Sequence, residues 1–133
     1  MNTNLIKAVV NGLHCDDLEE LMGTLEDIIN HGIDGGFGDF VYYSDTVKFF
    51  LDNRDEIIDL VKEEASDFGV EPIEFVSSFV VLNGNDWTDE IGRAIYGVIE
   101  EDDVTIPNAL TWFAAEDVAR YLTDSPELIE NYI

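Results

Sequence analysis

The side chains that could do chemistry in this chain are almost all carboxylates. Asp and Glu make up 30 of its 133 residues, against six Lys and Arg, and the formal net charge is −24. Two carboxylates can act as general acid and base only when a cleft sets one pair apart. Acids occur throughout this sequence and no pair stands out, so we expect a non-enzymatic protein that needs no cofactor.

One cluster of other reactive residues lies near the N-terminus. His14 and Cys15 are adjacent, and His31 follows about one helix later. Such residues can form a Cys/His nucleophile or a zinc site. The chain has a single cysteine, however, and no CxxC or HxxxH spacing. We therefore expect Cys15 to be a packing residue and expect no metal site here.

Two loop-like segments resemble ligand-binding loops only in part. The glycines of residues 32–38 lack the GxxxxGK[ST] pattern, and Asp34 and Asp39 would repel a phosphate. The segment NGNDWTDE at 83–90 is rich in oxygen ligands but misses the glycine at position 6 of a calcium-binding EF-hand loop. Both segments are predicted to be loops or turns without a bound ion.

The carboxylates of residues 50–68 are predicted to form a stripe. On one continuous helix they occupy an arc of about 120°, opposite the apolar residues. The stripe consists of Asp52, Asp55, Glu56, Asp59, Glu63 and Asp67. It places one acid per 4 to 5 Å of axis, approximately, near the 3.4 Å axial spacing of phosphates on a DNA strand. This spacing favours a partner-binding face, with an ordinary solvated helix face as the alternative.

A second group of acids begins the preceding helix. It comprises Asp16, Asp17, Glu19 and Glu20, with no basic residue between Lys7 and Lys48. Acids in a first turn also complement the helix dipole, so this group can serve the helix as well as a partner. We predict it to be a second part of the partner-binding surface. The run EEDD at 100–103 is predicted to be a solvated turn.

The hydrophobic periodicity predicts an all-α fold of seven or eight short helices in one domain over residues 1–133. The first helix should stop at Gly12, and the second should run from a cap at Asp16 or Asp17 to Gly32. The glycine-rich residues 32–40 should form a loop and residues 40–43 a brief extended piece. Helices that pack in one bundle would hold the acidic groups at fixed positions on its surface.

The second half of the chain is predicted from its caps. Ser44 should cap a helix that either continues to Phe68 or breaks near Asn53. Three more helices follow: one from Pro72 to 83–85, one from Asp86 or Thr88 with Val98 inward, and one from Thr105 or Pro107 through Leu122. Ser125 and Pro126 start a terminal turn. Most aromatic residues, including Trp87, Tyr96, Trp112 and Phe113, are predicted to be core.

Composition limits the class of protein. With 46% hydrophobic residues the chain can bury a core, and its longest apolar stretch, residues 75–82, is too short to span a bilayer. No leader pattern is visible at the N-terminus and Cys15 is alone, so we expect a cytoplasmic protein. The charge should repel nucleic acid and anionic lipid. Adaptation to high salt is an alternative origin of the charge, although the many Ile and Phe and few Ala and Arg are against it.

Three segments together resemble a known family. They are GGFGDFVYYSDTVKFFLDNRDEIIDLVKEEASDFG at 35–69, DEIGRAIYG at 89–97 and NALTWFAAEDVARYL at 108–122. The chain is similar there to small uncharacterised acidic helical domains from bacteriophages, prophages and mobile elements. In that context the resemblance implies a counter-defence factor, such as an anti-CRISPR or anti-restriction inhibitor. The family supplies no catalytic residues.

The charge and the resemblance lead to one expected function. The acidic stripe would mimic nucleic acid and occupy the basic DNA- or RNA-binding channel of a host protein, such as a CRISPR effector or a restriction enzyme. The alternative is a structural or interaction domain of a phage or mobile element, whose charge serves mainly solubility and whose functional surface is apolar.

Overall fold

The computed structural model describes residues 1–31, 43–80 and 86–132, and all regular structure within them is helical. The helices are α1 (Thr3–Leu13), α2 (Leu18–His31), α4 (Tyr43–Asp52), α5 (Arg54–Phe68), α6 (Pro72–Phe79), α7 (Thr88–Tyr96), α8 (Thr105–Asp124) and the 3₁₀ helix η2 (Pro126–Tyr132). The predicted all-α bundle is confirmed. The predicted loop at 32–40, the N-terminal part of the extended piece at 40–43 and the turn at 83–85 lie outside the described residues.

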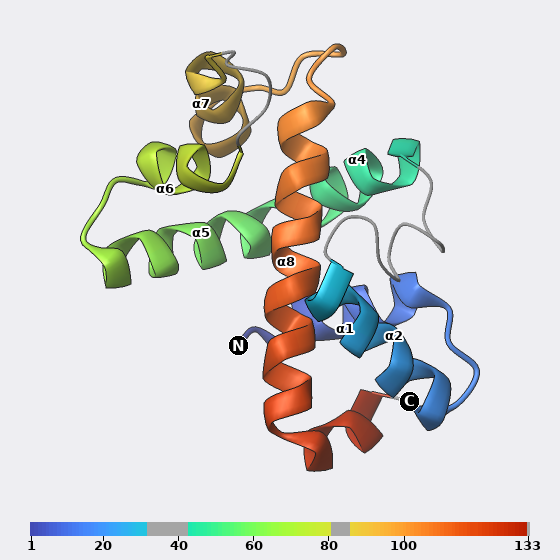
Figure 1. Ribbon diagram of the computed structural model, residues 1–133. Coiled ribbons are helices and arrows are strands. Elements are labelled where there is room, and N and C mark those ends of the chain that lie inside the picture. Colours follow the sequence, from blue (N-terminus) through green and yellow to red (C-terminus); the bar gives the residue numbers. More distant parts are fainter. Residues whose placement is uncertain (32–42, 81–85, 133) are drawn as a thin grey trace.

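The long helix α8 is the centre of the molecule. It runs through the middle of Figure 1, with α5, α6 and α7 on one side of the view and α2 on the other. Its buried residues occur along its whole length, among them Ile106, Leu110, Val118 and Leu122. Two buried hydrogen bonds link α8 to α4. The Thr46 hydroxyl donates to Asn108, and the Thr111 hydroxyl donates to the Thr46 carbonyl at 2.7 Å. The helix α8 therefore fixes the relative positions of the others.

Each of the first two helices begins at a side-chain cap, and the one at Asp17 is among those predicted from sequence. Asn2 Oδ1 accepts from the backbone of Asn4 at 2.8 Å, and Asp17 Oδ1 accepts from the backbone of Glu20 at 2.8 Å. The predicted stop of the first helix at Gly12 is wrong. The helix continues to Leu13, which is fully buried, and ends at His14 in the left-handed conformation (φ 54°). Burial of Leu13 outweighs the weak helix propensity of glycine.

The acidic segment is divided between two helices. The break lies at Asn53, whose backbone N–H and side-chain Nδ2 both donate to the Phe49 carbonyl at 3.0 Å. These two hydrogen bonds close α4, and α5 starts at Arg54, so that the two helices lie on either side of α8 in the view of Figure 1. Of the two possibilities left open by the sequence, the broken helix is the one observed. The helix α4 begins at Tyr43, so Ser44 lies inside it and is not its N-cap.

Three predictions for the second half of the chain need correction. The helix α6 ends at Phe79 rather than at 83–85. Val98 is 80% exposed because α7 ends at Tyr96, before the helical spacing reaches it. Asp103 is buried rather than part of a solvated turn, since Arg93 binds it.

The described helices also bear on membrane insertion. None of them combines the length and the apolar character that crossing a bilayer requires.

Candidate functional site

The candidate site is the outer side of α5. The helix buries Ile57, Ile58, Val61 and Ala65 against the rest of the bundle. Its opposite side carries acids at every fourth position. Neighbouring acids are therefore about 6 Å apart along the helix axis. These acids are Asp55, Asp59, Glu63 and Asp67, all exposed, with the half-buried Glu56 beside them. We call these five residues the α5 acidic face.

No member of the α5 acidic face forms an ion pair with a basic residue within the described part of the chain. The ion pairs found there are Lys48 with Asp52, Arg93 with Asp103 and Arg120 with Glu116, and none includes a member of the face. Like charges one turn apart repel each other by about 0.2 to 0.5 kcal/mol per pair. The face therefore keeps its full charge at some cost to stability.

Asp52 does not belong to this face. It ends α4, ahead of the break at Asn53, and it forms an ion pair with Lys48 one turn earlier. The predicted stripe is thus shorter by one residue, because one continuous helix was needed to align Asp52 with the others.

The basic residues next to the α5 acidic face are engaged elsewhere. The Arg54 guanidinium donates to three carbonyls at the end of α7: Ala94 at 3.0 Å, Arg93 at 2.9 Å and Gly97 at 2.6 Å. Cations at this end of a helix interact favourably with its dipole. The ammonium of Lys62 lies 5.7 Å from the centre of the Tyr96 ring, a cation–π contact. Arg54 and Lys62 thus serve the junction with α7 rather than the acids.

Two surface hollows border the α5 acidic face. One, of about 390 Å³, lies between α5 and the end of α7 and is lined by Arg54, Asp55, Ile58, Asp59, Lys62, Ile95 and Tyr96. The other, of about 170 Å³, lies towards the N-terminus and is lined by Met1, Asn2, Leu5, Glu56, Asp59, Leu60 and Glu63. Asp59 lines both hollows, together with Asp55 in the first and with Glu56 and Glu63 in the second.

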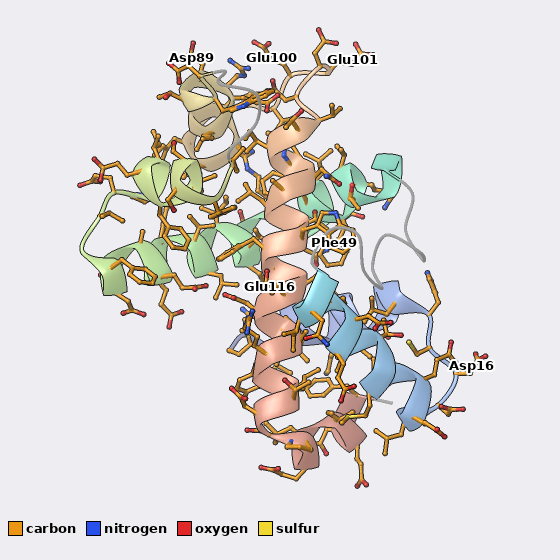
Figure 2. All side chains as sticks on the ribbon, viewed as in Figure 1. Asp16, Phe49, Asp89, Glu100, Glu101 and Glu116 are labelled. Carbon is orange, nitrogen blue, oxygen red and sulfur yellow. The ribbon has the colours of Figure 1, made fainter. Side chains whose placement is uncertain are left out.

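The second predicted group of acids lies elsewhere on the surface. Asp16, Asp17, Glu19 and Glu20 are exposed at the start of α2. Asp16 stands on the opposite side of α8 from α5 in Figure 2. Asp17 and Glu20 also have local roles, because Asp17 caps α2 and Glu20 accepts from the backbone of Asp16 at 3.1 Å. The structure does not join this group and the α5 acidic face into one surface.

One α5 carboxyl faces inward. Glu64 meets Asp117 of α8, and its Oε2 is buried without a hydrogen bond from an amide, hydroxyl or basic donor. Burial, together with the hydrogen bond and charge of Asp117, raises the pKa of Glu64 to about 8. Burial also raises the pKa of Asp117. At neutral pH the pair therefore holds a proton, which removes one negative charge from α5.

Of the Cys/His cluster, the Cys15 thiol contacts a hydroxyl and a carbonyl, whereas the side chain of His31 lies outside the described residues. Cys15 Sγ donates weakly to Thr24 Oγ1 at 3.6 Å and to the Leu13 carbonyl at 3.8 Å. Burial raises the pKa of its thiol, with the charges of nearby acids adding to the effect, and so disfavours the reactive thiolate. Throughout the described ranges, no three His, Cys, Asp or Glu side chains converge as metal ligands.

Comparison with known proteins identifies the family. A family model described as Domain of unknown function (DUF7222) matches residues 3–128. The chain belongs to this family. No curated protein and no solved structure matches it. The DUF7222 match covers every described helix except the last residues of η2, so the family and the helical bundle are the same unit.

The partners of the basic residues could not be found from sequence. Tyr96 was expected in the core, yet it is 60% exposed and carries Lys62 over its ring. Arg54 reaches carbonyls about 40 positions away along the chain. Backbone carbonyls exist at every residue, so no side-chain pattern marks such a contact.

Proposed function

We propose that this DUF7222 protein is a non-enzymatic inhibitor that mimics nucleic acid. The α5 acidic face would occupy the basic DNA- or RNA-binding channel of another protein. The observation that carries the proposal is the row of exposed carboxylates at Asp55, Asp59, Glu63 and Asp67, none of which is in an ion pair within the described residues.

The spacing of the row supports this role. Its four members extend over about 18 Å of helix axis. Lys and Arg side chains that neutralise successive phosphates of a nucleic acid can pair with carboxylates at this spacing, and Arg can do so bidentately. The association would be fast and would weaken steeply with salt, as expected for complementary charged surfaces.

The use of the basic residues supports it as well. Arg54 and Arg93 are bound to backbone carbonyls and to Asp103, and neither forms an ion pair with the α5 acidic face among the described residues. A protein whose charge served solubility alone would gain stability from one lysine among the acids on this row. The resemblance to phage and mobile-element domains makes a CRISPR effector or a restriction enzyme the target class that we propose.

The test is a charge reversal on the row. We expect the double variant Asp59→Lys, Glu63→Lys to require at least about tenfold more protein to inhibit DNA binding by a purified target nuclease. The matched control, Glu127→Lys with Glu130→Lys, changes the net charge equally on exposed residues of η2. It should leave inhibition within about twofold.

The alternative function is an interaction domain with an apolar working surface. Inhibition or binding that survives about 0.5 M salt, where the Debye length falls to about 4 Å, would favour it. Equal effects of the α5 and η2 double variants would reject the α5 acidic face as the binding surface.

A further inference from the structure

A cluster of aromatic rings that is partly exposed lies at the far end of α5. Phe68 stacks on Phe75 with ring centres 5.9 Å apart, and Phe75 meets the edges of Phe79 and Phe113 at 5.6 and 5.7 Å. Phe79 stacks on Phe113 at 5.3 Å. The four rings, supplied by α5, α6 and α8, therefore form one continuous cluster.

The outer part of this cluster is open to solvent. Phe68 is 72% exposed, Phe79 39% and the neighbouring Val70 38%. By helical spacing Phe68 belongs to the buried side of α5, but the helix extends past the core before Gly69 ends it in the left-handed conformation (φ 70°). We call Phe68, Val70 and Phe79 the aromatic patch. Exposed apolar groups that gather in this way mark interaction surfaces more often than single ones do.

The surroundings of the aromatic patch are acidic. Asp67, Glu71 and Glu74 are all exposed and are neighbours in sequence of Phe68, Val70 and Phe75. None of them takes part in an ion pair in the described part of the chain. A second copy of this chain seated on the patch would bring these acids and a net charge of −24 against their equals. A basic partner would instead be attracted.

We propose that the aromatic patch docks an amphipathic, basic helical segment of a protein partner. Apolar side chains of that segment would cover Phe68 and Phe79, while flanking Lys or Arg would pair with Asp67, Glu71 and Glu74. Helices laid on a hydrophobic surface use anchors at i, i+3, i+4 and i+7 in this manner. The inference rests on the proposed function in one respect, the basic character of the partner.

The experiment uses two synthetic peptides with the same content of Leu, Lys and Ala. In one, the Leu residues follow helical spacing along one side; in the other, the order is scrambled. Binding of each labelled peptide to the full chain is measured by fluorescence anisotropy over a series of salt concentrations. We expect the amphipathic peptide to bind at least about tenfold more tightly than the scrambled one.

Variants then locate the site. Phe68→Ser should raise the Kd of the amphipathic peptide about tenfold and leave the slope of log K against log salt unchanged, because no charge is removed. The matched control, Leu18→Ser, alters an apolar residue that is 41% exposed at the start of α2. It should change Kd less than about twofold, and thermal melts confirm that both variants fold.

Several results would overturn the inference. They are the absence of saturable binding, equal binding of the two peptides, and an unaltered Kd in Phe68→Ser. Self-association in sedimentation equilibrium that Phe68→Ser abolishes would assign the patch to a second copy instead. The proposed function fails separately, through unchanged nuclease inhibition by the Asp59→Lys, Glu63→Lys variant.

Discussion

Two regions of this molecule treat carboxylates in opposite ways. At the junction of α7 and α8, Asp103 is almost fully buried, and Arg93 binds both of its oxygens at 2.8 Å. On the outer side of α5, Asp59 and Glu63 are exposed and unpaired among the described residues. The difference shows that the chain supplies a cation where a carboxylate holds elements together and supplies none on the α5 acidic face.

The junction uses several polar contacts at once. Asp103 also accepts from the backbone of Glu100 at 2.9 Å, and Glu90 Oε2 accepts from the backbone of Ile106 at 3.0 Å, in the first turn of α8. The pKa of Asp103 is lowered mainly by its hydrogen bond with Arg93. Charge there stabilises a specific geometry, whereas charge on α5 repels itself and is available to a partner.

The largest predicted effect breaks the junction. Arg93→Ala leaves the Asp103 carboxylate buried without its cation and should lower the free energy of unfolding, measured by urea denaturation, severalfold more than the loss of an exposed ion pair does. Arg120→Ala is the control, because its ion pair with Glu116 is exposed and should contribute less than about 0.5 kcal/mol. Similar losses in the two variants would contradict the proposed difference between buried and exposed pairs.

The ion pair of Arg93 with Asp103 also predicts how the free energy of unfolding changes in acid. The folded pKa of Asp103 lies below its unfolded value, so its contribution to stability is present above the unfolded pKa and is lost as pH falls through the folded one. The destabilisation caused by Arg93→Ala should therefore shrink in acid, as pH falls towards the lowered folded pKa of Asp103 and its carboxylate becomes protonated. Urea denaturation at a series of pH values measures it, and a pH-independent loss would contradict the prediction.

The next effect concerns Arg54, which joins α5 to the end of α7. Arg54→Met keeps an apolar stem but removes three hydrogen bonds to carbonyls, and we expect a loss of about 2 kcal/mol in the free energy of unfolding. In the Arg54→Met variant, hydrogen exchange relative to the wild type should increase more in the last turn of α7 than in α2. Uniform exchange across both helices would argue against a local role.

Glu64 sharpens the comparison between paired and unpaired carboxylates. It lies on α5 and has no cation as a partner among the described residues, but unlike Asp59 and Glu63 of the α5 acidic face it is not exposed. Its folded pKa of about 8 exceeds the unfolded value, so the contribution of Glu64 to stability is fully present below the unfolded pKa and is lost as pH rises through the folded pKa. Glu64→Gln should be more stable than the wild type by about 1 kcal/mol at alkaline pH, and the difference should vanish in acid. Urea denaturation at several pH values measures it; a constant difference would contradict the assignment.

The smallest effect is on the α5 acidic face itself. Asp59→Lys with Glu63→Lys should raise stability by about 0.5 kcal/mol at low salt, because the two outer pairs of the row, with Asp55 and with Asp67, change from repulsive to attractive while the central pair stays like-charged. The gain should diminish in high salt, as surface charges are screened. A loss of stability would mean that these acids have a structural role, contrary to the function proposed for them.

Several features of the fold follow from sequence alone. The cap at Asp17 and the proline at the start of α6 predict helix starts that the structure confirms. These signals are local, since a cap binds backbone groups two or three residues away. The segregation of acids and apolar residues on α5 is equally readable, because helical spacing assigns each residue to a side.

The tertiary structure decided the rest. Asp103 looked like part of a solvated acidic turn until Arg93, ten residues earlier, was seen to bind it. Phe68 has the spacing of a core residue but lies beyond the core, and Asp52 has the spacing of the stripe but lies before the helix break. Sequence determines which side of a helix a residue occupies. Whether that side is buried, and which charged residue pairs with it, depends on segments that are distant along the chain and meet only when it folds.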